Sequence, residues 1–506
     1  MFKFSIILVI LIISFSNFAI YGGEEKHNLS ISAGEAVSFL ITPEGNLYAW
    51  GRNDHGQLGD GSTTNRSAPI RVLTDVAEVS AGLSFTLALR TDGTVWAWGN
   101  NDFGQLGDGT TTSSLLPIKV LYDAISISAG QQQSLAIRTD NTLWAWGNTM
   151  FNPYANNIPT NSYIPKQIME NIKAISAGTA HNTVIKSDGT LWAWGQNRRG
   201  ELGDGTNTFR SMPVKILDDV ISVSAGEGHT MVIRSDHSLW GWGRNRLGAL
   251  GNGITEDTNE PIFIMDNVVS VSAGLSYTMV IKDDGSLWAW GVNHGNQFGD
   301  FPISYSYTPA KLMEGVVSIA SGGIAFGTRI FAHMLAICAD GSLWAWGNNE
   351  YGQTKDNHLI YISTPTRVIE NILDFAKQRT NIELRFVIGQ ATYYVNNVEY
   401  TAMNPPFIDS DYNRTMIPLR LVSEALGAEV YWDSQARSAR ITKDDSSVAI
   451  NIGSPLPDGM GMPIIIEGTV FVPLAHIAQQ FGITTRWDGY TQSIYIHMNL
   501  TTTNHV

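Results

Sequence analysis

The feature that most constrains the fold is a unit of 48 residues that recurs seven times. A triplet resembling Ser-Ala-Gly marks each unit, and its glycine advances by 48 residues at every step, at Gly34, Gly82, Gly130, Gly178, Gly226, Gly274 and Gly322. The Trp-Gly dipeptide keeps the same register at Trp50, Trp98, Trp146, Trp194, Trp242, Trp290 and Trp346, except that the last step is 56 residues. Eight extra residues therefore lie between Gly322 and Trp346. Self-similarity at this period is typical of a propeller or a repeat array.

Each unit carries the pattern of four short strands. Residues 85–99 predict two strands joined by a tight turn, because Asp92-Gly93 supplies the positive φ that such a turn requires. The β-rich segment from Pro117 onward adds further strands. Seven four-stranded units predict a mainly β chain in which residues 29–376 form a closed seven-bladed β-propeller. The turn recurs as Asp188-Gly189, Asp284-Gly285 and Asp340-Gly341, with Glu44-Gly45, Asp140-Asn141 and Asp236-His237 as variants.

The paired tryptophans of each unit are predicted to fill the gaps between blades. In a strand, Trp96 and Trp98 point to one face and Ala97 points to the other. The small alanine then leaves room for the indoles of the next blade. Thirteen of the 15 tryptophans occupy these positions. No tryptophan of the propeller is therefore expected to serve as a platform for a ligand.

The repeat resembles the regulator of chromosome condensation repeat family. The matching signature, Trp-Gly-x-Asn-x-x-Gly-Gln-Leu-Gly-Asp-Gly, runs from Trp98 to Gly109 and is nearly complete from Trp50 to Gly61. The third unit lacks the Gln-Leu-Gly-Asp-Gly stretch, and the sixth and seventh are degraded. The resemblance covers about residues 29–376 and implies a protein-binding ring. The nucleotide-exchange activity of the nuclear member is not expected here, and a closer parallel is a secreted bacterial β-lactamase inhibitor built from the same repeat.

A partner is expected to bind at one rim of the ring. The hairpin turns define one rim, so the segments after Ser-Ala-Gly and after Trp-Gly must share the other. Residues there differ between units, which leaves them free to contact an asymmetric partner; the alternative is drift at solvated loop tips. Aromatic and arginine side chains are common interface anchors. The candidates are His55, Phe103, Phe151, Tyr154, Arg198, Arg199, Arg246, Leu247 and Tyr351, together with Phe326 and Arg329 from the eight extra residues.

The propeller sequence predicts no metal site, no cofactor and no catalysis. The Asn and Asp residues of the 100–109 loop lack the spacing of a calcium site and are expected to bind backbone groups of the turn. His181, His229 and His333 occupy equivalent places in three units, where each is expected to bind a neighbouring backbone group. The single cysteine, Cys338, is expected to be an incidental strand residue. No Ser nucleophile motif or metal-spaced His pair appears.

The amino terminus and the charge indicate an exported protein. Residues 1–23 read as a secretory signal peptide, with an uncleaved anchor as the alternative. The formal net charge of −14 disfavours nucleic acids and anionic membranes as partners. One cysteine permits no intrachain disulfide, and a secreted chain without disulfides suggests a bacterial exterior. We expect a monomer that is extracellular or at the cell surface, without a membrane span in the mature chain.

A second repeat follows the propeller and predicts a small α+β domain over residues 382–498, after a polar stretch at 377–381. Segments 415–441 and 469–496 each read as strand, helix and strand after a hairpin. They resemble the copper amine oxidase N-terminal-like domain, a stalk-type module of secreted bacterial proteins. Oxidase chemistry is not expected, because the domain lacks the quinone motif and the three histidine ligands. Trp432 and Trp487 are expected in its core, and His476 is expected at its surface.

Together these features predict a secreted or cell-surface, non-catalytic binding protein. The propeller rim would recognise an extracellular protein or a cell-wall glycan, and the C-terminal module would act as a spacer or attachment. The alternative is a secreted inhibitor of an extracellular enzyme such as a β-lactamase.

Overall fold

The computed structural model describes most of the chain and divides it into two compact units, Met1–Leu373 and Asp374–Val506. The residues described are 29–148, 161–293, 298, 305–326, 329–354, 359–395, 398–401, 404–410, 414–419, 422–423, 429–433, 436–443, 446–457, 460–481, 484–488 and 492–499. The predicted signal peptide at 1–23 lies outside them. Among the described residues, no helix combines the length and the apolar character needed to cross a membrane.

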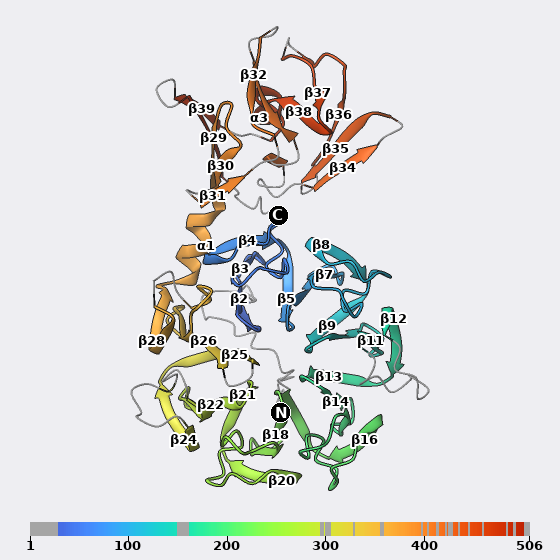
Figure 1. The fold of residues 1–506 in the computed structure, drawn as a ribbon, viewed down its shortest axis with the longest axis vertical. Helices are drawn as coiled ribbons and strands as arrows, with labels where there is room; N and C mark the ends of the chain where they lie inside the picture. Colours follow the sequence, from blue (N-terminus) through green and yellow to red (C-terminus); the bar gives the residue numbers. More distant parts are fainter. Residues whose placement is uncertain are drawn as a thin grey trace, which may run out of the picture. The chain divides into compact units, whose positions relative to one another are not determined.

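Seven four-stranded antiparallel sheets form the first unit, and Figure 1 shows them arranged as blades around one ring. The predicted seven-bladed propeller is confirmed. Blades 1 to 3 comprise β1 (Ser30–Ala33), β2 (Val37–Ile41), β3 (Leu47–Gly51) and β4 (Arg66–Leu73); β5 (Val76–Ala81), β6 (Phe85–Arg90), β7 (Val95–Gly99) and β8 (Ser114–Leu121); and β9 (Ala124–Ala129), β10 (Gln133–Arg138), β11 (Leu143–Gly147) and β12 (Ser162–Met169).

Blades 4 to 7 follow the same order from the hub outward. They comprise β13 (Ile172–Ala177), β14 (His181–Lys186), β15 (Leu191–Gly195) and β16 (Arg210–Leu217); β17 (Val220–Ala225), β18 (His229–Arg234), β19 (Leu239–Gly243) and β20 (Thr258–Met265); β21 (Val268–Ala273), β22 (Tyr277–Lys282), β23 (Leu287–Val292) and β24 (Tyr305–Met313); and β25 (Val316–Phe326), β26 (Arg329–Cys338), β27 (Leu343–Asn348) and β28 (Tyr361–Ile369).

The second tryptophan of each pair packs between two blades, as predicted. Trp98 is fully buried and joins a core cluster with Phe39 and Ala49 of blade 1. Its Nε1 donates a hydrogen bond of 2.9 Å to the backbone oxygen of Gln57, also in blade 1. The first tryptophan, Trp96, packs against the same cluster but remains half-buried. A buried indole therefore packs between each blade and the preceding one, and in five of the seven blades the structure also shows its hydrogen bond to a backbone oxygen of that preceding blade.

The hairpin turn holds the first tryptophan in place. Gly93 has a φ of 79°, which confirms the positive φ expected from Asp92-Gly93. Asp92 Oδ1 accepts hydrogen bonds from the backbone N and the Oγ1 of Thr94, at 2.9 and 2.6 Å. Thr94 Oγ1 in turn accepts a bond of 2.9 Å from Trp96 Nε1. The recurrent Asp, Gly and Thr thus form one local network rather than three separate signals.

The Ser-Ala-Gly triplets hold the seven innermost strands together. The backbone N of Ala129 donates to Ser80 Oγ at 2.9 Å, and the backbone N of Ala177 donates to Ser128 Oγ at 3.0 Å. Glycine is required at the third position because the strands converge there. A β-carbon on Gly130 would lie only 2.7 Å from the carbonyl oxygen of Gly178. The periodicity of this triplet therefore reflects contacts between blades at the hub.

The ring closes between blade 7 and blade 1 through the same contacts that join the other blades. Trp50 Nε1 and Ser38 Oγ both donate to the backbone oxygen of Gln353, at 2.9 and 2.8 Å. Ser38 Oγ also lies 3.0 Å from His333 Nε2, a contact that recurs between blades 4 and 5 and between blades 5 and 6. Each blade is one continuous segment of chain, so among the described residues no strand is exchanged between blades 7 and 1. Closure therefore depends on packing and on side-chain hydrogen bonds.

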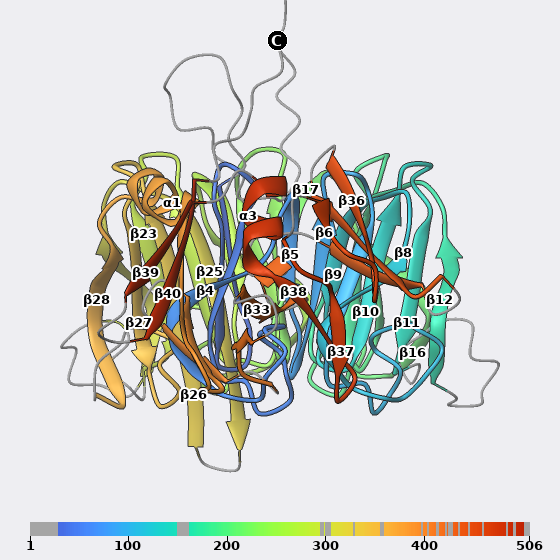
Figure 2. The same cartoon turned by 90° about the horizontal axis from the view of Figure 1, so that it is seen from above.

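The eight extra residues lengthen the first hairpin of blade 7. In blade 2 the β5–β6 ladder ends at Ala81 and Thr86. In blade 7 the equivalent pair is Ser321 with Met334, and five further pairs follow, ending at Phe326 with Arg329. The insertion thus forms a two-stranded ribbon that extends past the other strands at one rim (Figure 2).

The second unit is a small α+β domain. Its sheets comprise β29 (Asn381–Val387), β30 (Thr392–Val395), β31 (Val398–Thr401), β39 (Thr484–Asp488) and β40 (Ser493–Asn499); β32 (Phe407–Asp409), β33 (Arg414–Pro418), β37 (Ile464–Ile466) and β38 (Thr469–Pro473); and β34 (Glu429–Asp433), β35 (Ser438–Lys443) and β36 (Ser446–Asn451). Helix α3 (Leu474–Phe481) follows β38, as the second strand–helix–strand copy predicts. Its core gathers Phe386, Ile417, Ile441 and Ile477.

The expectations for three residues of this part of the chain are wrong. Trp432 and Trp487 are 42% and 51% exposed, and each lies on a strand, β34 or β39, that is at the edge of its sheet among the described residues. His476 is buried rather than at the surface. Helix α1 (Ile372–Thr380) runs through most of the polar stretch 377–381, with Ile372 and Ala376 buried one turn apart, and β29 starts at Asn381.

Candidate partner-binding rim

One rim of the propeller carries both the Ser-Ala-Gly turns and the loops after Trp-Gly, as predicted; we call it the Ser-Ala-Gly rim. The two kinds of segment are directly hydrogen-bonded, since the backbone N of Arg52 donates to the oxygen of Ala36 at 2.9 Å. At the centre of this rim the seven innermost strands surround an open cavity of about 300 Å³. Its lining includes the residue that follows each glycine: Glu35, Leu83, Gln131, Thr179, Glu227, Leu275 and Gly323.

A charged cluster lies on this rim where blades 7, 1 and 2 meet. The guanidinium of Arg52 pairs with the carboxylates of Glu35 and Asp54 and lies 5.4 Å from the ring centroid of Tyr351. Ser84 Oγ of blade 2 donates to Glu35 at 3.0 Å. Burial raises the pKa of Glu35 above its usual value even though Arg52 and Ser84 act to lower it. Tyr351 is therefore held between blades by a cation rather than projecting freely.

Blade 5 repeats this arrangement with the same residue types. Arg244 pairs with Glu227 at 2.8 Å, and Ser276 Oγ of blade 6 donates to Glu227 at 3.3 Å. Burial likewise raises the pKa of Glu227. The sequence reasoning missed both pairs, although a signal was present. In each case the glutamate follows Ser-Ala-Gly and the arginine comes 17 residues later, which the other units do not show together.

Polar side chains that recur from unit to unit hold the loops after Trp-Gly in shape. Asn101 Oδ1 accepts a bond of 2.9 Å from the backbone N of Leu106, and Asn101 Nδ2 donates to Asp108 at 3.1 Å. Gln105 Oε1 accepts a bond of 2.9 Å from the backbone N of Phe103. The expected role of Asn and Asp in binding turn groups is confirmed. Within the described part of the chain, no three His, Cys, Asp or Glu side chains are grouped as a metal site would need.

The predicted binding residues of the described loops lie at the loop tips of the Ser-Ala-Gly rim, with differing exposure. His55, Arg198 and Arg246 are exposed, whereas Phe103, Arg199, Leu247 and Tyr351 are half-buried. Phe151 and Tyr154 lie outside the described residues. Phe326 and Arg329 are opposite each other at the end of the β25–β26 ribbon, and only their backbone is described.

Two of the predicted arginines, from different blades, meet at one carboxylate. Arg199 of blade 4 contacts Asp257 at 3.1 Å, and Arg246 of blade 5 lies 3.8 Å from the same carboxylate. Asp257 also accepts a bond of 2.9 Å from the backbone N of Asn245. This part of the rim is thus an exposed charged surface, with two cations for one anion.

The three equivalent histidines are sealed between blades and reach no opening. His181 and His229 place Nε2 2.9 and 3.0 Å from the hydroxyls of Thr230 and Thr278 of the next blade. For these two histidines, a hydroxyl takes the place of the expected backbone partner. Burial lowers the pKa of His181 to about 4 and that of His229 to about 3. Neither side chain is placed to exchange a proton with a substrate at the rim.

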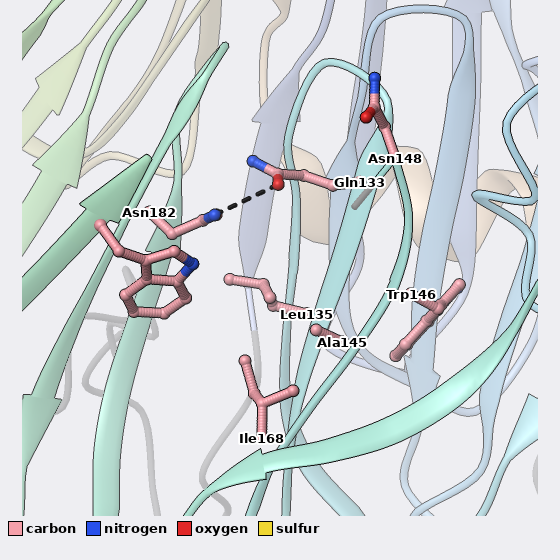
Figure 3. Close-up of a pocket in the computed structure, with 8 residues that line it drawn as sticks. Gln133, Leu135, Ala145, Trp146, Asn148, Ile168 and Asn182 are labelled. Carbon is pink, nitrogen blue, oxygen red and sulfur yellow. Dashed lines mark hydrogen bonds between the residues drawn. The ribbon is translucent and has the colours of Figure 1, made fainter. Parts of the chain in front are cut away.

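A small gap between blades 3 and 4 contrasts with the open rim. It is about 10 Å³, and Figure 3 shows Leu135, Ala145 and Ile168 around it, with Asn182 Nδ2 donating to Gln133 Oε1 at 3.2 Å. This is room for about one water molecule. Trp194 Nε1, at its edge, has no partner among the described residues, since the carbonyl that such an indole binds elsewhere falls at residue 153 here. The gap is a local packing defect rather than a ligand site.

Comparison with known proteins supports the geometry. The family model of the RCC1-like domain matches residues 19–325, and that of the regulator of chromosome condensation (RCC1) repeat matches residues 331–353. The chain belongs to the RCC1-like domain family. The copper amine oxidase N-terminal domain matches residues 374–441 and 394–457, in agreement with the second predicted resemblance.

Solved RCC1-like propellers share the fold at low identity. Human WBSCR16 is 21% identical with a TM-score of 0.57, and covers 64% of this chain and 94% of its own. Yeast RCC1 (Prp20), in a structure bound to Kap60, is 21% identical with a TM-score of 0.56, and covers 67% of this chain and 85% of its own.

Two curated proteins match this chain over about one repeat. A segment of 47 residues is 45% identical to the human E3 ubiquitin-protein ligase HERC2, which is 9% of this chain and 1% of HERC2. A segment of 34 residues is 59% identical to the Protein RCC2 homolog of Danio rerio, which is 7% of each chain. These matches support the RCC1-like repeat and reach no further into those proteins.

Proposed function

We propose that this RCC1-like chain is a secreted or cell-surface, non-catalytic binding protein whose Ser-Ala-Gly rim recognises an extracellular protein or a cell-wall glycan. The RCC1-like propeller indicates a protein-binding or regulatory role. The C-terminal domain serves as a spacer or an attachment. The predicted signal peptide supports export, so we place the protein outside the cytoplasm in this proposal.

One observation carries the proposal: the repeated residues are used inside the molecule, and the variable ones are at the rim. Trp98, Asp92 and Asn101 make internal bonds that recur from blade to blade. At the loop tips the equivalent positions hold His55 in one blade and Arg199 in another. A ring of seven similar blades thereby presents an asymmetric surface, as recognition of an asymmetric partner requires.

A non-catalytic role fits the chemistry of the buried polar groups. The histidines are desolvated and bonded to hydroxyls of the next blade. The turn aspartates, such as Asp92, bind their own turn. Glu35 and Glu227 are bound to arginine and serine side chains. Each of these groups already has a structural partner.

The proposal is tested by capturing a partner from the native extracellular fraction with the full chain. Replacement of Phe103, Arg199, Phe326 and Tyr351 by Ala is expected to abolish capture, because anchors of this type carry most interface energy. The matched control replaces Thr91 and Thr139, exposed at the hairpin turns of the opposite rim, by Ala. Equal capture by the wild-type chain and the quadruple variant, with unfolding temperatures unchanged, contradicts a rim site.

A second candidate function is inhibition of an extracellular enzyme such as a β-lactamase. The projecting β25–β26 ribbon beside an open cavity favours it, since such a rim can enter or cover a concave site. Hydrolases assayed with and without the full chain separate the two functions. Inhibition that is lost when the ribbon residues 324–331 are removed supports the second, and unchanged rates across the panel exclude it.

A further inference from the structure

Blades 2 and 3 differ from the others near the start of their outermost strand, at the two residues that follow its first residue. Blade 2 has Leu115 and Leu116 there, and blade 3 has Tyr163 and Ile164. These side chains are 38%, 48%, 43% and 53% exposed, respectively. The equivalent residues are Ser67 and Ala68 in blade 1, and Asn259 and Glu260 in blade 5. Two consecutive large apolar residues at these positions therefore occur side by side in neighbouring blades.

The loops of the Ser-Ala-Gly rim connect the two apolar pairs. The loop of blade 1 rests on the first pair, since a β-carbon on Gly56 would lie 2.5 Å from Leu115 Cδ2. The loop of blade 2 rests on the second pair, since a β-carbon on Gly104 would lie 2.3 Å from Tyr163 Cδ1. The backbone N of Gly109 also donates to the oxygen of Tyr163 at 2.8 Å. The pairs thus flank one loop, whose tip carries Phe103.

The same loop carries two exposed carboxylates without a cation. In blade 1, Asp60 is paired with Arg66 at 2.8 Å, and in blade 4, Asp204 is paired with Arg210 at 2.6 Å. In blade 2 the arginine position is Ser114, so Asp108 accepts bonds only from the neutral Asn101 and Thr110. Asp102, at the loop tip, accepts a bond from Asn100 Nδ2 at 2.9 Å. Neither carboxylate forms an ion pair with a described residue.

We propose that this apolar and acidic arc, defined by Leu115, Leu116, Tyr163, Ile164, Asp102 and Asp108, binds a basic, amphipathic segment of a partner protein. Apolar side chains of the segment contact the two apolar pairs, and a lysine or arginine between them pairs with Asp102 and Asp108. Apolar area provides affinity, and the unpaired carboxylates select the charge. The net charge of −14 attracts the same kind of segment at long range. The inference rests on the proposed binding role and specifies the chemistry of the partner.

The arc is tested with a phage library of random dodecapeptides selected on the immobilised full chain. Enriched peptides are expected to combine aliphatic or aromatic residues with lysine or arginine. Affinity of a synthetic enriched peptide is then compared between the wild-type chain and three variants. L116S/I164S is expected to weaken it about tenfold or more, as loss of interface anchors does. D102N/D108N is expected to weaken the binding and to reduce its dependence on salt concentration.

The matched control is N259A/E260A, at the equivalent positions of blade 5. It is expected to leave the affinity unchanged within about twofold, since surface residues outside an anchor cluster contribute little. Thermal unfolding of each variant confirms that the propeller is intact. The proposal is overturned if the selection enriches acidic peptides or no peptide at all. It is also overturned if L116S/I164S leaves the affinity of the enriched peptides unchanged. Selective binding of a polysaccharide at the arc overturns it as well.

The two proposals fail in different ways. If the native partner is lost by the Phe103, Arg199, Phe326 and Tyr351 variant but retained by L116S/I164S and D102N/D108N, the rim function stands and the arc is wrong. If every rim variant retains the partner, both are wrong.

Discussion

At the scale of single residues, the buried histidines show how the propeller joins its blades. The hydroxyl of Thr278 donates to the backbone oxygen of Ala249 at 2.8 Å, so it has only a lone pair to offer His229 Nε2 at 3.0 Å. The same logic applies to Ser38, which donates to Gln353 and faces His333. These imidazoles are therefore neutral with the proton on Nε2. Protonating Nδ1 would place a cation in a desolvated site.

This arrangement predicts acid sensitivity. Burial lowers the pKa of His181 and His333 to about 4 and that of His229 to about 3, all below the ordinary value of 6.5. The unfolded chain then binds more protons, so the free energy of unfolding falls as the pH falls from about 6.5 towards 4. Over this pH range each histidine lowers the free energy of unfolding by up to roughly 3 kcal/mol, since a shift of one pKa unit corresponds to about 1.4 kcal/mol. Thermal unfolding measured across this range checks the slope.

Replacing the three histidines by glutamine tests the cause of that slope. Glutamine already occupies the equivalent position of blade 3, as Gln133, so the substitution has a precedent in the chain. The triple variant is expected to lose less stability than the wild-type chain between pH 6.5 and 4. H55Q, at an exposed loop tip, serves as the control. Identical slopes for the triple variant and the wild-type chain would refute the assignment.

At the scale of the element, the two tryptophans of one strand do different work. The side chain of Trp96 is half-buried, binds its own turn through Thr94 and has the guanidinium of Arg90 5.7 Å from its ring centroid. The side chain of Trp98 is fully buried and binds the preceding blade through Gln57. The first residue thus fixes the hairpin, and the second fixes the interface between blades.

This division predicts unequal costs for the same substitution. Trp98→Phe removes a buried hydrogen bond and leaves a cavity, and is expected to cost about 2–4 kcal/mol. Trp96→Phe is expected to cost about 1 kcal/mol, because its indole is half-exposed and its partner, Thr94, can bind water instead. Urea unfolding of the full chain, followed by tryptophan fluorescence and circular dichroism, measures both. Equal costs would mean that the interface bond contributes nothing.

At the scale of the whole molecule, the described strands close the ring without one being exchanged between blades. The bonds of Ser38 Oγ and Trp50 Nε1 to the backbone oxygen of Gln353 in blade 7 recur at the other interfaces whose loops are described. Loss of this one interface would open the ring. We therefore expect the interface between blades 7 and 1 to be about as stable as any other interface between neighbouring blades.

Closure predicts equivalent effects at distant interfaces. Ser38→Ala and Thr278→Val each remove one hydroxyl and leave a histidine N–H and a backbone oxygen short of a partner. Each is expected to cost about 1–3 kcal/mol, the usual penalty for an unsatisfied buried group. Differential scanning calorimetry compares the two variants. A full cost for Thr278→Val with none for Ser38→Ala would show that blades 1 and 7 do not meet.

The propeller, its seven blades, the hairpin turns and the rim that carries the variable loops all follow from residue spacing. Each blade meets nearly identical neighbours, so selection of packing residues repeats every 48 positions and is visible in one chain. The Asp-Gly turn and the Trp-Ala-Trp alternation are local, and local rules of backbone geometry suffice to interpret them. The same periodicity identifies the candidate loop-tip residues, because they are the positions at which the units differ from one another.

Contacts that only particular pairs of blades make required the folded chain, because the 48-residue period does not show which side chains meet. The cluster of Glu35, Arg52 and Ser84, and the loop of blade 2 lying on Tyr163, depend on how one blade is placed against the next. The same holds for Trp432, which is 42% exposed on β34 although its strand pattern predicts a core residue. An amino-acid pattern describes which face a side chain takes along its own strand. Whether anything covers that face is settled by distant segments.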